Sequence, residues 1–208
     1  MDYINEIKAL AEKGQRIDPK CHIFGAIHHK WHFGESVNLQ QIHSFESDMK
    51  ITLPKPFVRY LTELGNGGAG PNYGIYSLEM MRKENPFIAK TINFPVMLDH
   101  SLTAAQWNDF AQEYVALEDK ILAGEFDTTE EEEHAVQKLG AMELNLIAGG
   151  IFISTPGCTM HSLLMCRGAA MGEVFTIDFD NIFQLQSEPY CGRKFEDWVI
   201  REMQRSLK

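Results

Sequence analysis

The chain has 208 residues, of which 44% are hydrophobic and 23% charged, and its formal net charge is −10 at pH 7. This composition is that of an ordinary globular protein and excludes a disordered or fibrous chain. No run approaches the length of a membrane span, and the N-terminal segment reads as an amphipathic helix with acids in it, so we expect a cytoplasmic protein made without a signal peptide.

Two helices and a strand are predicted in the first half of the chain. Asn38 is a suitable N-cap for a helix whose apolar residues recur every three or four positions up to Met49. A second helix follows Pro54, and the glycine-rich run 65–68 ends it, because glycine and asparagine accept a left-handed backbone. Aromatic and branched residues in 73–78 then predict a first strand.

The second half begins with helices. An apolar stripe from Trp107 to Ile121 predicts a helix that starts after Ser101, and Thr129 with the glutamates that follow it predicts another that runs towards Leu139. Short apolar runs at 144–154, 161–166, 172–177 and, less regularly, 182–186 predict an antiparallel meander. A closing amphipathic helix is expected from 195 to 207. The pattern is that of an α+β fold.

The negative charge is concentrated in one segment. Residues 109–133 contain ten acidic side chains and one lysine, which gives −9 of the net charge of −10. Such a segment repels nucleic acid and attracts a basic protein partner, although acids at a helix start are also common as a solvated face. The candidate partner-binding residues are Asp109, Glu113, Glu118, Asp119, Glu125, Asp127, Glu130, Glu131, Glu132 and Glu133.

Three other groups of residues have the composition of functional sites but lack the pattern that such sites require. Five histidines between His22 and His43 lie near Cys21, but they lack the paired spacing of a structural zinc site, so we expect no metal. The four cysteines form no CxxC pair and are expected to be reduced. The run 66–70 closes a helix instead of opening one, which favours a structural turn over a phosphate-binding loop.

Catalytic residues are also not evident. Ser154, Cys158, His161, Ser162 and Asp178 include the residue types of a hydrolytic triad, but no Gly-x-Ser-x-Gly elbow accompanies them. We therefore expect a protein that is not an enzyme and needs no cofactor.

The order of several short motifs resembles that of a known family. A helix with Phe45-Glu46 precedes Leu53-Pro54, the next helix ends in Asn66-Gly67-Gly68, and the last helix carries Trp198. This order is similar to that of the SUKH superfamily, which includes bacterial toxin-immunity proteins and fungal regulators of cell-wall synthesis.

The resemblance implies a single domain with a central antiparallel sheet and helices packed around it. Its core would span about 39–207, with an N-terminal extension at 1–38 and a helical acidic insertion at about 101–139. It also implies a binding role, either as an immunity protein that blocks a toxin, often a nuclease, or as a regulatory or scaffolding protein. We expect a protein partner, with the basic toxin domain as the first choice, and neither nucleic acid nor a membrane.

Overall fold

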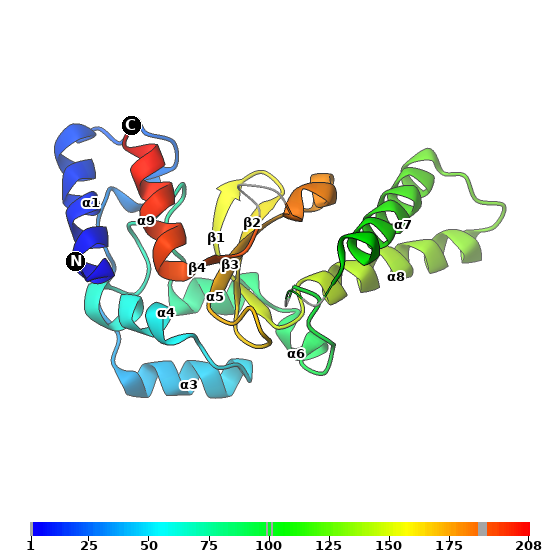
Figure 1. Cartoon of the computed structure of the whole chain (residues 1–208), viewed down its shortest axis with the longest axis horizontal. Helices are drawn as coiled ribbons and strands as arrows, with labels where there is room; N and C mark the ends of the chain where they lie inside the picture. Colours follow the sequence, from blue (N-terminus) through cyan, green and yellow to red (C-terminus); the bar gives the residue numbers. More distant parts are fainter. Residues whose placement is uncertain (1, 99, 101, 187–190) are drawn as a thin grey trace.

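The computed structural model describes residues 2–98, 100, 102–186 and 191–208. At the centre lies an antiparallel sheet in the order β1-β2-β3-β4, with helices on both sides (Figure 1). The strands are β1 (Gly150–Gly157), β2 (Met160–Met165), β3 (Glu173–Asp178) and the two-residue β4 (Arg193–Lys194). The predicted α+β class and its central antiparallel sheet are confirmed.

Both faces of the sheet are apolar. Ile151 pairs with Leu164 and Phe152 pairs with Leu163, and side chains alternate between the two faces of the strands. One face, with Ile151 and Leu164, belongs to a core that also includes the N- and C-terminal helices, whereas Phe152 and Leu163 belong to a second core on the other face. The sheet therefore needs a cover on each side.

The first face is covered by helices from both ends of the chain. Helix α1 (Tyr3–Ile17) lies beside α9 (Phe195–Ser206), and the two contribute Ile7, Ala11, Val199 and Met203 to the core (Figure 1). The same core includes residues of α3 (Leu39–Met49), α4 (Lys55–Arg59) and the π-helical turn η1 (Tyr60–Leu64). Residues 1–38 thus include part of this core.

Short helices complete this side of the molecule. They are α2 (Ala26–His29), α5 (Leu78–Glu84) and α6 (Ile88–Thr91). The predicted N-cap at Asn38 is confirmed: its side chain accepts a hydrogen bond from the backbone of Gln41, and the Gln41 side chain accepts one from the backbone of Asn38. This reciprocal pair fixes the start of α3.

The second face is covered by the base of a helical hairpin. Helices α7 (Ala104–Ala123) and α8 (Thr129–Leu146) pack against each other and project away from the sheet (Figure 1). Trp107, Tyr114 and Leu146 near the base are buried with Phe175 of the sheet. Among the described residues, no helix is both long and apolar enough to cross a bilayer.

Three predicted elements differ from the structure. The strand expected at 73–78 is reduced to a single bridge between Ile75 and Gly68, because Ser77 caps α5 and the chain turns into a helix at Leu78. The strand expected from 144 begins only at Gly150, since α8 continues to Leu146.

The run 182–186 is not a strand. It belongs to a 3-10 segment, η2 (Phe179–Gln186), that follows β3 directly. The backbone N–H of Asp180 donates to the side chain of Asp178, and this local bond turns the chain out of the sheet.

The outer edge of β1 is closed by side-chain and loop hydrogen bonds. Asn85 is 1% exposed, its Oδ1 accepts from the backbone N–H of Phe152 at 2.7 Å, and its Nδ2 donates to the Phe152 carbonyl at 3.0 Å and to that of Met81 at 2.7 Å. The N–H of Tyr76 donates to the carbonyl of Ile153 at 2.8 Å. The buried edge groups of β1 are therefore paired without a fifth strand.

Replacing Asn85 with alanine should destabilise the fold by about 2–4 kcal/mol, because it removes three buried hydrogen bonds and leaves the backbone groups of Phe152 unpaired. Urea unfolding followed by circular dichroism measures this change. The same substitution at exposed Asn93 is the control and should change the free energy of unfolding by about 0.5 kcal/mol or less. Equal effects of the two substitutions would contradict this role of Asn85.

Candidate functional site

The ten acidic residues predicted to bind a partner all lie on the α7–α8 hairpin. Four are on α7, Glu125 and Asp127 are in the connection, and four are in the first turns of α8. Nine of the ten are exposed and Glu118 is half-buried. The segment with nearly all of the net charge is therefore an arm that extends from the sheet (Figure 1).

Two of these acids hold the hairpin together. Glu113 of α7 forms an ion pair with Lys138 of α8 at 2.6 Å. The backbone N–H of Glu131 donates to the side chain of Thr128, and the Glu131 carboxylate accepts from the backbone of Asp127. Thr128, one residue earlier than predicted, thus caps α8. Glu113 and Glu131 have internal roles that the sequence analysis did not distinguish.

Glu118 lies in a group of like charges at the base of the hairpin. Burial raises the pKa of Glu118, and the negative charges of Asp180, Asp119 and Glu143 raise it further. Beside this group, the hydroxyl of Tyr114 donates to Glu143 at 3.0 Å, and burial together with that carboxylate raises the pKa of Tyr114. The group is a point of electrostatic repulsion between the hairpin and the start of η2.

The other seven acids are exposed and form no ion pair within the described residues. For Asp109, Asp119, Glu125, Asp127, Glu130, Glu132 and Glu133, the described residues contain no ion pair with a lysine, arginine or histidine. Between the helices lies a groove of about 680 Å³ whose wall includes Leu117, Phe126 and Ala135. Its charged lining is mixed, with Glu130 and Glu131 beside Lys120 and Lys138. This arm can attract and contact a basic surface.

The histidine-rich segment does not gather into a metal site. No group of three potential ligands that could hold a metal ion occurs in the described part of the chain. His29 is 8% exposed, its Nδ1 accepts from the backbone N–H of Trp31, and its Nε2 lies 3.3 Å from the Asn72 carbonyl. Burial lowers the pKa of His29, so the neutral ring with a proton on Nε2 fits both contacts.

The glycine-rich loop is a structural turn. Gly67 and Gly68 have φ angles of 78° and 100°, and a Cβ on Gly68 would lie 2.4 Å from the carbonyl oxygen of His32. The side chain of Asn66 accepts from the backbone N–H of Leu78 at 2.8 Å. The loop therefore binds neighbouring backbone and holds residues 33–35 against residues 75–78, as expected for a structural turn.

The Ser and His residues considered for hydrolysis do not form a triad. Ser154 is buried, and its hydroxyl donates to the Gly74 carbonyl at 2.8 Å. His161 stacks on Phe152 at 4.5 Å, while Ser162 follows it on β2 and points to the opposite face. No nucleophile–base hydrogen bond joins them.

The motif residues behind the family resemblance have packing roles. Phe45, Leu53, Pro54 and Trp198 are buried. The carboxylate of Glu46 accepts a hydrogen bond of 2.7 Å from the backbone N–H of Leu53, which ties the end of α3 to the chain that precedes α4. The Phe-Glu and Leu-Pro motifs therefore interact directly.

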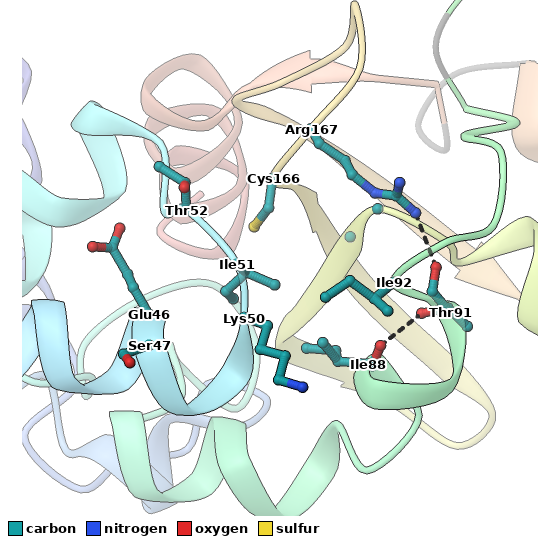
Figure 2. Close-up of a pocket in the computed structure, with 12 residues that line it drawn as sticks. Glu46, Ser47, Lys50, Ile51, Thr52, Ile88, Thr91, Ile92, Cys166 and Arg167 are labelled. Carbon is teal, nitrogen blue, oxygen red and sulfur yellow. Dashed lines mark hydrogen bonds between the residues drawn. The ribbon is translucent and has the colours of Figure 1, made fainter.

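A pocket of about 430 Å³ lies next to this contact (Figure 2). It is formed by the end of α3, residues 51–52, α6, the start of β1 and the end of β2. Ile51, Ile88 and Ile92 line it, and the thiol of Cys166 points into it. Arg167 donates through Nη2 to the carbonyls of Thr91 and Phe94 at 2.9 and 2.7 Å, which fixes one wall.

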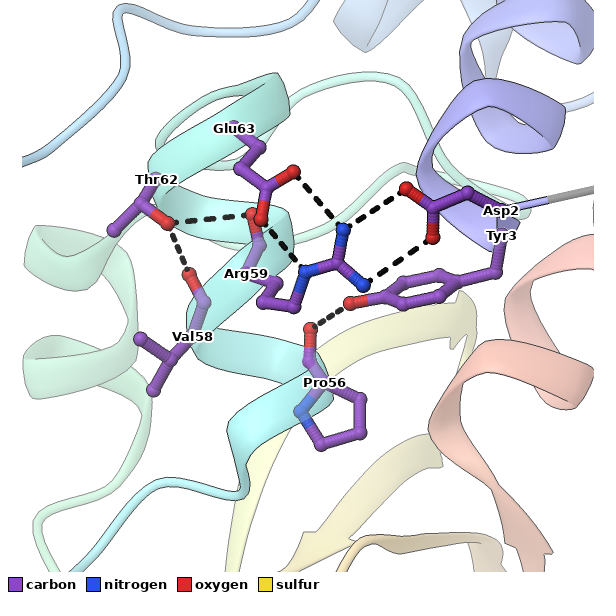
Figure 3. Close-up of polar contacts among 7 residues, drawn as sticks. All are labelled: Asp2, Tyr3, Pro56, Val58, Arg59, Thr62 and Glu63. Carbon is purple, nitrogen blue, oxygen red and sulfur yellow. Dashed lines mark hydrogen bonds and ion pairs between the residues drawn. The ribbon is translucent and has the colours of Figure 1, made fainter.

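The guanidinium of Arg59 lies in a further charged cluster (Figure 3). It donates two hydrogen bonds to Asp2, at 3.2 and 2.9 Å, and two to Glu63, at 2.7 and 3.1 Å. The Tyr3 hydroxyl donates to the Pro56 carbonyl at 2.8 Å, and burial raises the pKa of Tyr3 to about 12. All four side chains are used to attach α1 to α4 and η1, so this cluster is a structural clamp.

Together, the fold and these surfaces define an α+β protein with an acidic helical arm and a separate small pocket. Comparisons of the chain with protein-family models, with curated proteins and with solved structures found no match.

The pocket was not predicted from the sequence. Its lining comes from four separate segments, 46–52, 88–92, 149–150 and 166–167, and the only local signal was the Phe45-Glu46 motif, which lies at its edge. Its cysteine and isoleucines have no recognisable spacing. The tertiary fold alone brings them together.

Replacing Glu118 with glutamine should stabilise the protein at pH 7.5 and have little effect near pH 4. When the pKa of a carboxyl is higher in the folded state than in the unfolded state, the folded protein loses stability as pH rises through the interval between the two values. Glutamine removes this loss because it does not ionise. Thermal unfolding of both proteins at the two pH values tests the prediction, and a gain that is equal at both would contradict it.

Proposed function

We propose that the chain is a non-catalytic binding protein of the immunity type, which neutralises a basic toxin domain by covering it in a one-to-one complex. The observation that carries this proposal is the projecting hairpin with seven outward acidic residues that have no cationic partner in the described chain. Forming the sheet and its two cores does not require these charges. A surface of this kind suits a basic protein.

The electrostatics fit a nuclease toxin well. An enzyme that cleaves nucleic acid needs a positively charged groove for the phosphates, and an arm with a net charge of −9 competes for the same groove. The arm is about 30 Å long, as expected for the 20 residues of α7, and is long enough to enter or cover such a groove. Binding by this means needs neither a cofactor nor turnover.

The resemblance to the SUKH superfamily gives additional support. The motif order is that of the family, and the Glu46–Leu53 hydrogen bond and the Asn66–Gly68 turn give these motifs a physical reason to occur together. A regulatory or scaffolding role on a partner of the same cell would use the same surface. The two functions differ in the partner, which is a toxin for immunity and an endogenous protein for regulation.

The proposal is tested by co-expression of the chain with the product of the adjacent gene. A growth-inhibiting product that is rescued by the chain, and that co-purifies with it in a one-to-one complex, would support immunity. Rescue that persists without physical binding would contradict occlusion. A growth phenotype on deletion in a pure culture, with no toxic neighbour, would replace immunity with regulation.

The triple substitution of Glu130, Glu132 and Glu133 to glutamine should slow association with the basic partner by about threefold to tenfold at low salt, because long-range attraction is lost. Dissociation should change less. Glu131 is left unchanged because it takes part in capping α8. Stopped-flow mixing at low and high ionic strength measures both rates, and the difference between the proteins should shrink as salt rises.

A matched control removes the same charge elsewhere. The exposed acids Glu12, Glu35 and Glu79 lie outside the hairpin, and their conversion to glutamine should leave association nearly unchanged. Both triple variants should retain thermal stability, since exposed substitutions change it by about 0.5 kcal/mol each or less. Equal slowing by the two variants would place the contact outside the hairpin.

A further inference from the structure

The pocket beside α3 and α6 has an apolar interior. Ile88 is 5% exposed, Ile51 and Ile92 are half-buried, and all three line the space together with Cys166, which is also 5% exposed (Figure 2). Burial raises the pKa of the Cys166 thiol, and the nearby carboxylate of Glu46 adds to the effect. The thiol is therefore neutral, and the interior suits an apolar group.

The charges around this interior are mainly positive. Lys50 and Arg167 line the pocket together with a single carboxylate, Glu46. The Glu46 carboxylate already accepts the backbone N–H of Leu53, whereas no ion pair of Lys50 occurs within the described residues. In a chain with a net charge of −10, an excess of positive charge at an apolar pocket favours an anionic ligand.

The backbone of Lys50 adds an independent observation. Lys50 is the C-cap of α3, with a φ angle of 54° in the left-handed region. Glycine or asparagine would adopt this conformation with less strain. This cap ends α3 at the edge of the pocket, and Lys50 is one of the residues that line it.

We propose that this pocket binds a small organic anion, a carboxylate with a compact apolar body. The carboxylate would pair with Lys50, because the Arg167 guanidinium is already held by the carbonyls of Thr91 and Phe94, and the body would contact Ile51, Ile88 and Ile92. The volume of 430 Å³ is within the range of small-molecule sites and fits one ring system or a short branched chain. An inorganic anion would leave the apolar wall uncovered. This site is separate from the acidic hairpin.

The test uses the full chain and the dye 8-anilinonaphthalene-1-sulfonate, an apolar anion whose fluorescence rises in apolar pockets. The dye is then displaced with 1-naphthoate or with 1-naphthalenemethanol, which has the same rings and no charge. We expect naphthoate to displace the dye at a concentration about fivefold lower, because one exposed ion pair contributes little more than this. Equal potency of the two, or no binding of the dye, would overturn the proposal.

Two pairs of variants locate the binding. Cys166→Met extends a side chain into the pocket and should abolish dye binding, whereas Cys166→Ala should retain it. Lys50→Asn suits the left-handed backbone and should remove the fivefold preference for naphthoate, while Lys8→Asn on α1 should not. Circular dichroism shows that each variant is folded. If Cys166→Met does not fold, the Lys50 and Lys8 pair decides, and a preference unchanged by Lys50→Asn would overturn the proposal.

Discussion

The sheet has to be covered on both faces, because the side chains of its three longer strands are apolar in both directions. Ile151, Leu164 and Val174 lie in one core, and Phe152, Leu163 and Phe175 lie in the other. The first requirement brings α1 and α9 together from opposite ends of the chain. The second is met by the base of the α7–α8 hairpin, so the arm that carries the charge is also a part of the fold.

The sequence predicted those parts that depend on local chemistry. The cap at Asn38, the helix after Pro54, the turn at Gly67 and Gly68, the apolar stripe of α7 and the closing helix are all visible in residue spacing and in side chains that bond their own backbone. Such signals act within a few residues, and this is why they can be read without the fold.

The predictions that were wrong missed local caps as well as tertiary contacts. Residues 73–78 have a strand-like composition, but Ser77 starts a helix, and the edge of β1 is completed by Asn85 from another segment. Eight of the ten acidic residues lie on α7 and α8, yet the sequence did not separate Glu113, Glu118 and Glu131, which act within the fold, from the seven that face outward. The pocket at Cys166 depends on four separate segments and could not be predicted from spacing.

The position of the charge on the hairpin has a consequence for how the molecule turns in solution. The rest of the chain is nearly neutral, and the arm that carries the charge is about 30 Å long. The protein therefore has a large electric dipole moment along the hairpin. Within about one screening length of a positively charged surface, roughly 8 Å at physiological salt, this dipole experiences a torque that turns the tip of the hairpin towards that surface.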